Sequence, residues 1–172
     1  MKQGTFVISL DFELVWGIFD HIRLEDKVKY FDTTLTVIPQ ILKCFEKNGV
    51  HATWATVGML FNDNWDEWMV NRPEERPTYT QKNLDAYAYG LAHRNSGLDR
   101  FFFAPHLIKE ILQTPGQELG THTYSHYYCM EPGQTVRQFQ ADLAQAVQLA
   151  QKFGVTMESL VFTRNKLHAA NL

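Results

Sequence analysis

The sequence predicts an α/β fold in which parallel strands are joined by helices, and three observations support this class. Apolar segments rich in β-forming residues alternate along the chain with segments of helical periodicity. A strand, a helix and a second strand occur before Gly58, the order expected of a βαβ unit with parallel strands and a right-handed crossover. Acidic residues and histidines follow the ends of two predicted strands, where parallel α/β folds collect their functional side chains.

The first predicted strand starts at Thr5 and runs into two nearby carboxylates, Asp11 and Glu13. Alternate side chains of a strand point to opposite sides, so these two would share one face and stand roughly 6–7 Å apart. Like charges this close cost free energy unless a cation lies between them or one is protonated. We therefore favour a functional carboxylate pair over the alternative, an edge strand with a solvated face. The opposite face would carry the apolar residues Phe6, Ile8, Leu10 and Phe12.

A helix and a second strand follow. Residues 34–48 carry apolar side chains at helical spacing, and Gly49 stands where a helix commonly ends in the left-handed conformation. Pro39 either kinks this helix or marks its first turn. Residues 52–57 are apolar and β-prone, and they form the second predicted strand.

Residues 61–103 form an aromatic-rich insertion within the predicted domain. The segment lacks a sustained period and contains two Arg-Pro pairs, and it is far longer than an ordinary connection. Its aromatic side chains could line a sugar-binding cleft. The favoured interpretation is that they pack the insertion onto the rest of the domain, because large aromatic side chains are usually buried.

Regular structure is predicted again after the insertion. Residues 105–113 form a helix that begins with proline, and residues 118–121 form a short third strand. The helix over residues 135–154 begins with a capping box, in which Thr135 is followed three residues later by a glutamine. A fourth strand is expected at about residues 159–163.

Composition narrows the class of protein. The 172 residues are enough for one domain with a substantial core. The net charge is −3 and the basic residues are scattered, so we expect no nucleic-acid partner. No segment is long and apolar enough for a membrane span, and no signal peptide is visible. Cys44 and Cys129 are far apart in sequence and fit a reducing compartment, so we expect a cytoplasmic protein; its oligomeric state is left open.

His122 and His126 follow the third predicted strand and are spaced four residues apart. In an extended chain they would lie roughly 13 Å apart, so a shared metal ion requires the chain to curl after the strand. This spacing alone is more often that of surface or core histidines, and its position after a strand end gives it weight. Two imidazoles and one carboxylate with an open position form a usual catalytic zinc set, which leaves a second carboxylate to act as a base.

Four stretches of the sequence together resemble the polysaccharide deacetylase (NodB-homology) family. They are SLDFELVWG at 9–17, HATWATVG at 51–58, the run APHLIKEILQTPGQELGTHTYSH at 104–126, and VFTRN at 161–165. The resemblance implies a distorted parallel (β/α) barrel. Ordinary barrels need roughly 250 residues, and about four strands are present here. Residues 1–172 are therefore expected to be the N-terminal part of a single deacetylase-like domain.

The resemblance also implies roles for individual residues. Asp11 matches the catalytic base, and Arg164 matches the arginine that orients and tunes this aspartate. A surface arginine after a strand is an equal alternative for Arg164. Trp16 and Tyr124 are expected to contact the substrate.

His122 and His126 match the metal-binding histidines of the family, and the implied cofactor is a divalent ion, with Zn2+ as the first choice. In the common motif the metal carboxylate directly follows the base, and that position is Phe12 here. We assign the ligand role to Glu13 instead, because Glu13 is expected to share the face of Asp11.

The implied activity is metal-assisted hydrolysis of an N-acetyl or related acyl group on a carbohydrate, in surface polysaccharide metabolism. The family's leaving-group acid is a histidine expected beyond Leu172, and His168 does not stand in that motif. Two alternatives remain open: a non-catalytic carbohydrate-binding relative, and a metal-independent hydrolase of cyclic amides with the same fold.

Overall fold

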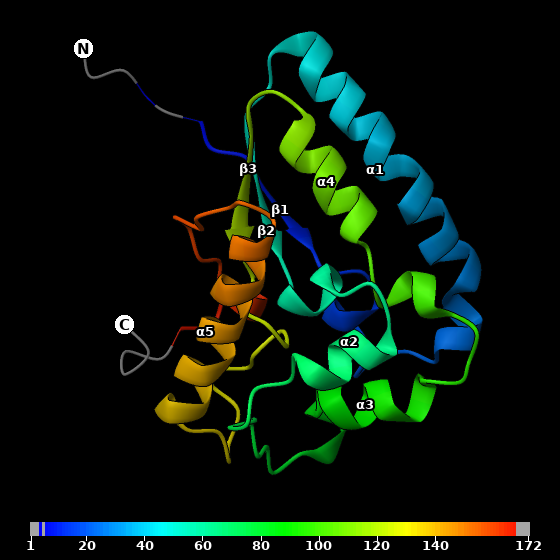
Figure 1. Ribbon diagram of the computed structural model, residues 1–172, viewed down its shortest axis with the longest axis vertical. Helices are drawn as coiled ribbons and strands as arrows, with labels where there is room; N and C mark the ends of the chain where they lie inside the picture. The colour runs from blue at the N-terminus through cyan, green and yellow to red at the C-terminus, as the bar shows by residue number, and fades with distance from the viewer. Residues whose placement is uncertain (1–3, 5, 168–172) are drawn as a thin grey trace.

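The computed structural model describes residue 4 and residues 6–167 and shows a small parallel sheet with helices around it (Figure 1). The strands are β1 (Ser9–Phe12), β2 (Ala52–Thr56) and β3 (Gln117–Thr121). β2 lies between β1 and β3, and both pairings are parallel. Asp11 lies beside Ala55, which lies beside Gly120. The predicted α/β class and the parallel βαβ unit are confirmed.

The first strand is shorter than predicted. Pairing of β1 with β2 begins at Ser9, opposite Thr53, and β2 itself begins only one residue earlier. The carbonyl oxygen of Ile8 still accepts the N–H of Thr53 at 3.0 Å, but Phe6 is not paired in the sheet; it is 88% exposed and does not share the buried face of Phe12. Thr5 lies outside the described residues. β-Propensity without a neighbouring strand was not enough to extend β1.

The first helix, α1 (Val28–Asn48), begins earlier than predicted and contains Pro39 in its interior. The hydroxyls of Thr33 and Thr34 donate to backbone carbonyl oxygens four residues earlier, at 2.8 and 3.0 Å, so these threonines are accommodated within the helix. Gly49 ends the helix at φ 61°, as predicted.

The helices α4 (Pro105–Gln113) and α5 (Val136–Lys152) lie where the sequence predicts them. The capping box at the start of α5 is present: Gln138 N donates to Thr135 Oγ1 at 3.2 Å, and Thr135 N donates to Gln138 Oε1 at 3.0 Å. α1 packs against α4 and α4 contacts β3, so these two helices lie side by side along the sheet (Figure 1). α5 also contacts β3, and Phe153 at its C-terminal end lies beside α4, with Lys109 Nζ 5.9 Å from the centroid of the Phe153 ring.

Residues 61–103, which the sequence predicts to be an insertion, form two short helices, α2 (Trp65–Val70) and α3 (Ala86–His93), with 3-10 turns at Lys82–Leu84 and Asp99–Phe101. Its large aromatic side chains belong to the main hydrophobic core, which supports the interpretation that they pack the insertion onto the domain. The buried members are Trp65, Trp68, Tyr79, Tyr87, Phe101, Phe102 and Phe103.

The fourth predicted strand is reduced to one parallel bridge between Thr121 and Leu160. Beyond it the chain forms a 3-10 turn, Thr163–Asn165. Within the described residues the sheet therefore has three strands and does not close into a barrel.

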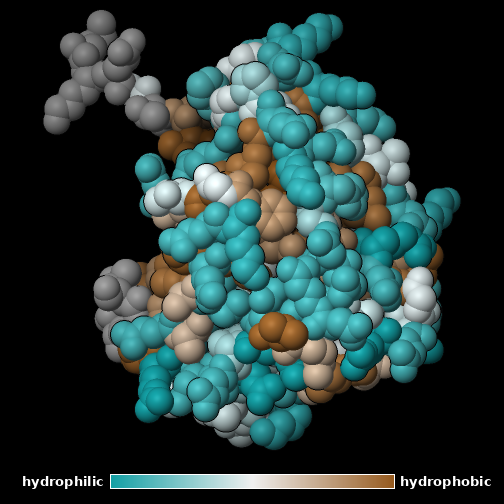
Figure 2. Space-filling view, viewed as in Figure 1, coloured by the Kyte–Doolittle hydropathy of each residue, from teal (hydrophilic) through white to brown (hydrophobic). Residues whose placement is uncertain are grey.

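The described surface is predominantly polar on the face shown in Figure 2, where hydrophilic side chains cover most of the molecule. Among residues 4 and 6–167, no helix combines the length and the apolar character needed to cross a membrane.

Candidate metal centre

Glu13 stands at the junction where β1 ends and a 3-10 turn, Leu14–Gly17, begins. Its backbone, at φ −136° and ψ −17°, has left the strand conformation, so strand alternation no longer determines where its side chain points. The carboxylate lies over Gly17, where a Cβ atom would come within 1.9 Å of Glu13 Cδ. The lack of a side chain at Gly17 therefore makes room for the carboxylate.

His122 directly follows β3 and is fixed at both its backbone and its ring. Its backbone N–H donates to the carbonyl oxygen of Thr56 at 2.9 Å. Its Nδ1 lies 2.8 Å from the carbonyl oxygen of Val161 and must donate, because a carbonyl oxygen can only accept. The other ring nitrogen, Nε2, lies 3.4 Å from Glu13 Oε2.

His126 returns to the same point because the chain curls after β3, as a shared metal ion requires. The curl is a tight loop in which Thr123 (φ 65°) and His126 (φ 56°) adopt the left-handed conformation. His126 Nε2 lies 3.1 Å from Glu13 Oε2. The conformation is uncommon for residues other than glycine, so the surrounding structure must hold it.

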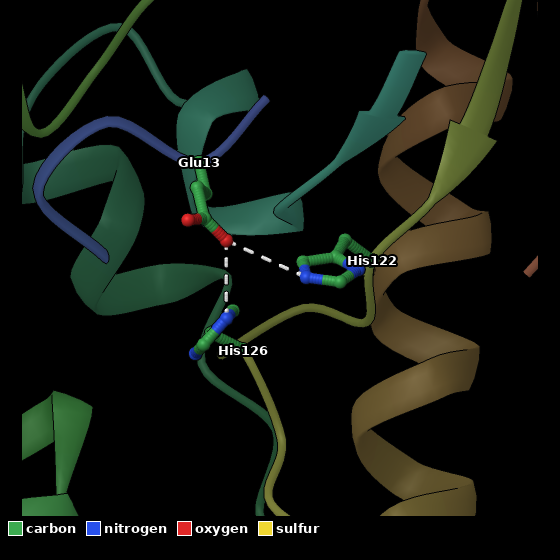
Figure 3. A group of neighbouring side chains, drawn as sticks. All are labelled: Glu13, His122 and His126. Carbon is green, nitrogen blue, oxygen red and sulfur yellow. Dashed lines mark ion pairs between the residues drawn. The ribbon is translucent and has the colours of Figure 1, made fainter. Parts of the chain in front are cut away.

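The three side chains Glu13, His122 and His126 form one group, with a possible ligand atom of each within 4.8 Å of the others. Figure 3 shows the carboxylate pointing toward both imidazole rings. The histidine side chains are 1% and 3% exposed, whereas that of Glu13 is 23% exposed. The group is thus enclosed on the histidine side and open to solvent at the carboxylate.

Electrostatics keep Glu13 ionised. Burial alone would raise the pKa of Glu13, but the hydrogen bonds and positive charge that His122 and His126 supply in their protonated forms outweigh it and hold this pKa at about 2. Burial lowers the pKa of His126 below its ordinary value, although its hydrogen bond to Glu13 acts in the opposite direction. Near neutral pH the group therefore contains an ionised carboxylate and a neutral His126 imidazole, the protonation states that metal ligation needs.

The donor set fits a divalent cation. When His122 is neutral, its single ring proton lies on Nδ1 and is donated to Val161, so Nε2 presents a lone pair to the Glu13 carboxylate. Two lone-pair donors facing each other at 3.4 Å repel unless a proton or a cation lies between them. These features match a carboxylate and two imidazoles arranged around one metal ion.

Asp11 lies on β1, two residues before Glu13, and is exposed. It does not belong to the group formed by Glu13 and the two histidines. Its exposure leaves its carboxylate accessible to water and to a ligand, and its assignment as the base stays a prediction.

Arg164 does not contact Asp11 in the part of the chain that the structure describes. Its guanidinium instead donates to the carboxylate of Asp20, lies 2.9 Å from His21 Nε2, and stacks 4.4 Å from the centroid of the Tyr128 ring. The Asp20 side chain is only 1% exposed. The predicted pairing of Arg164 with Asp11 is therefore replaced by a pairing with a buried carboxylate that sequence reasoning missed.

Trp16 and Tyr124, the predicted substrate contacts, are both 0% exposed. Trp16 Nε1 donates to the carbonyl oxygen of Phe102 at 2.8 Å, and its ring stacks on Trp68. Tyr124 lies against Gly58, where a Cβ would come within 2.8 Å of Tyr124 Cα. Burial counts against a substrate contact by either ring, and indicates packing roles instead.

Asp142 is a further residue that sequence reasoning missed. It is fully buried on α5 and binds the loop between the two histidines. A signal was present in the sequence: Asp142 occupies a position in the helical repeat between Phe139 and Ala146, which both face the core. A charged residue at such a position indicates a specific partner, although it does not say which one.

Comparison with known proteins adds one finding. No curated protein matches the chain. The sequence model of a family described as polysaccharide deacetylase matches residues 25–165, which include His122, His126 and Arg164 and exclude Asp11 and Glu13. The match covers most of the chain, and the chain belongs to the polysaccharide deacetylase family.

Proposed function

We propose that this protein is a metal-dependent hydrolase that removes N-acetyl groups from a carbohydrate, with Zn2+ as its metal ion. The observation that carries the proposal is the convergence of Glu13, His122 and His126, with possible ligand atoms within 4.8 Å of one another. Family membership supports carbohydrate deacetylation as the reaction class.

In this proposal Glu13 Oε2 and one ring nitrogen each of His122 and His126 would hold the ion. A divalent ion held there would supply a Lewis acid for the acyl oxygen and would increase the acidity of water. The 23% exposure of the Glu13 side chain leaves an approach for water and substrate on that side. The buried histidines, in turn, exclude solvent from the opposite side of the group.

Asp11 would accept the proton from the attacking water. It is exposed and precedes Glu13 by two residues, so it can act without being a ligand itself. Arg164, held by Asp20, would support the Tyr128 ring, which packs edge-on against the imidazole of His126.

The proposal is tested by zinc content after dialysis and by acetate release from a panel of N-acetylated sugars. Glu13→Gln should lose both bound zinc and acetate release. Asp11→Asn should keep the zinc and lose roughly 10²- to 10⁴-fold in rate, because it removes a general base. Glu110→Gln, which alters an exposed carboxylate on α4, should change neither measurement.

The outcomes separate the alternatives. Zinc binding without acetate release from any sugar would favour a carbohydrate-binding relative that has lost turnover. Hydrolysis of a cyclic amide that persists after chelation would favour the metal-independent hydrolase. A protein that neither retains zinc nor releases acetate would contradict the proposal.

A further inference from the structure

The loop from His122 to His126 has a strained backbone conformation that contacts with the rest of the protein must stabilise. It follows a strand, contains two left-handed residues other than glycine, and must bring two imidazoles back to one carboxylate. Left-handed conformations at Thr123 and His126 cost free energy and persist only when surrounding contacts impose them.

Some of these contacts are hydrogen bonds accepted by backbone carbonyl oxygens of the loop. The backbone N–H of Gly58 donates to the carbonyl oxygen of Thr123 at 2.8 Å, and that of Met59 donates to the carbonyl oxygen of Tyr124 at 2.9 Å. These bonds attach the loop to the 3-10 turn Gly58–Phe61, which follows β2. They leave the N–H groups at the apex of the loop to be bound by something else.

Asp142 on α5 binds the N–H groups at that apex. One carboxylate oxygen, Oδ1, accepts the backbone N–H of Tyr124 at 2.7 Å and that of Ser125 at 3.2 Å. The other, Oδ2, accepts the Ser125 hydroxyl at 2.5 Å and the Tyr87 hydroxyl at 3.4 Å. A single carboxylate on α5 thus holds two consecutive amides located between the two histidines.

The position of Asp142 is unusual for an acidic residue. It is 0% exposed, and burying a carboxylate is costly unless hydrogen bonds compensate. Among the described residues, Asp142 is the only ionisable side chain that accepts a hydrogen bond from a backbone N–H of residues 122–126. Hydrogen bonds to a charged acceptor are shorter and stronger than neutral ones, so this contact is suited to imposing a strained loop shape.

We propose that Asp142 is a positioning residue of the metal centre: its carboxylate holds the amides of Tyr124 and Ser125 and thereby sets the separation of His122 and His126. This inference rests on the proposed function, because it assumes that His122 and His126 are metal ligands. Asp142 itself touches neither the ion nor the substrate.

The test compares zinc affinity in two variants of α5. Asp142→Asn keeps the size of the side chain and one oxygen for the two amides, but it loses the charge. Leu149→Ala removes a buried side chain about two turns further along the same helix and destabilises the core without touching the loop. Competition titration with a zinc chelator at about pH 8 should show roughly 10-fold weaker zinc binding for Asp142→Asn. Leu149→Ala should bind zinc as the unsubstituted protein does.

A second readout needs no metal. Amide hydrogen exchange in the zinc-free protein should be accelerated at Tyr124 and Ser125 by Asp142→Asn and unaffected there by Leu149→Ala. Unchanged zinc affinity in Asp142→Asn would overturn the proposal, as would equal weakening by both variants. If the unsubstituted protein binds no zinc, the proposed function fails, whereas the exchange rates still decide whether Asp142 holds the loop.

Discussion

The two halves of the candidate metal centre are held in different ways. Glu13 is placed by its immediate sequence neighbours: β1 ends at Phe12, the chain turns, and Gly17 leaves space for the carboxylate. The histidine loop is held by residues far away in sequence, among them Asp142 and the carbonyl of Val161. We therefore expect that a substitution near Glu13 can displace its carboxylate without destabilising the fold. A substitution that displaces the histidine loop should also destabilise the packing around it.

The largest effect expected from a local change is that of Gly17→Ala. A Cβ atom at this position would lie 1.9 Å from Cδ and 2.0 Å from Oε1 of Glu13, so the carboxylate must leave the position in which it faces the two histidines. The displaced atoms are the end of a flexible side chain, so the fold should survive. We expect zinc affinity to fall roughly 10- to 100-fold with an unchanged circular dichroism spectrum.

The control for this substitution is Gly4→Ala, because a Cβ atom at Gly4 would have no atom of the described residues within 4 Å. Zinc titration of both variants is the measurement. Zinc binding of ordinary strength in Gly17→Ala would show that the empty space at this glycine does not position Glu13.

Gly58→Ala is the corresponding change on the histidine side. Here the added Cβ would lie 2.8 Å from Tyr124 Cα and 3.3 Å from Ala146 Cα, and backbone atoms cannot yield as a side-chain end can. We expect the free energy of unfolding to fall by about 1–3 kcal/mol, together with weaker zinc binding. Urea denaturation measures the loss of stability. A denaturation midpoint equal to that of the unsubstituted protein would contradict the claim that the histidine loop and the packing of the fold depend on each other.

Asp20→Asn tests the contact that holds Arg164. The Asp20 side chain is 1% exposed, and loss of its charge weakens hydrogen bonding to a guanidinium that is itself 27% exposed. We expect a loss of about 1–2 kcal/mol in unfolding free energy. Zinc affinity should be unchanged, because Asp20 is outside the group of Glu13 and the histidines.

The matched control is Asp32→Asn, which removes a pair with Arg100 in which both side chains are more than 40% exposed. Exposed pairs contribute little, so a loss of less than about 1 kcal/mol is expected. Equal losses in the two variants would mean that burial of Asp20 adds nothing to its contact with Arg164.

The last expected effect is a dependence of the free energy of unfolding on pH. Burial raises the pKa of Asp142 to about 6, although hydrogen bonds from Ser125 and Tyr124 act to lower it. Between about pH 4 and 6 the native protein therefore retains a proton that the unfolded chain releases. This group makes the unfolding free energy fall as pH rises through that interval, by at most about 1.4 kcal/mol per pH unit.

Asp142→Asn removes that dependence, so its stability relative to the unsubstituted protein should improve as the pH rises from about 4 to 6. Urea denaturation at several pH values measures the difference. Parallel stability curves for the two proteins would contradict the raised pKa.

The sequence predicted best what depends on local chemistry. The capping box at Thr135 and the helix-ending Gly49 are local signals, and both are found where they were predicted. The prediction that Phe6 belongs to the first strand was wrong, because a strand requires a neighbouring strand and the pairing of β1 with β2 begins only at Ser9.

In the candidate metal centre, too, local features could be predicted and contacts between distant residues could not. Glu13 and the histidines could be proposed from residue type and position after strand ends, and the structure places their side chains together. The partner of Arg164 could not be predicted, because Asp20 lies 144 residues away in the chain and meets it only in the folded protein.

The central claim is that Glu13, His122 and His126 bind one divalent ion, and a crystal structure of the zinc-loaded protein with anomalous diffraction at the zinc edge tests it directly. The account predicts one zinc peak, with an oxygen of Glu13 and a nitrogen of each histidine at roughly 2.0–2.2 Å. A protein loaded with zinc that shows no peak between these three side chains, or shows its zinc elsewhere, would contradict the claim.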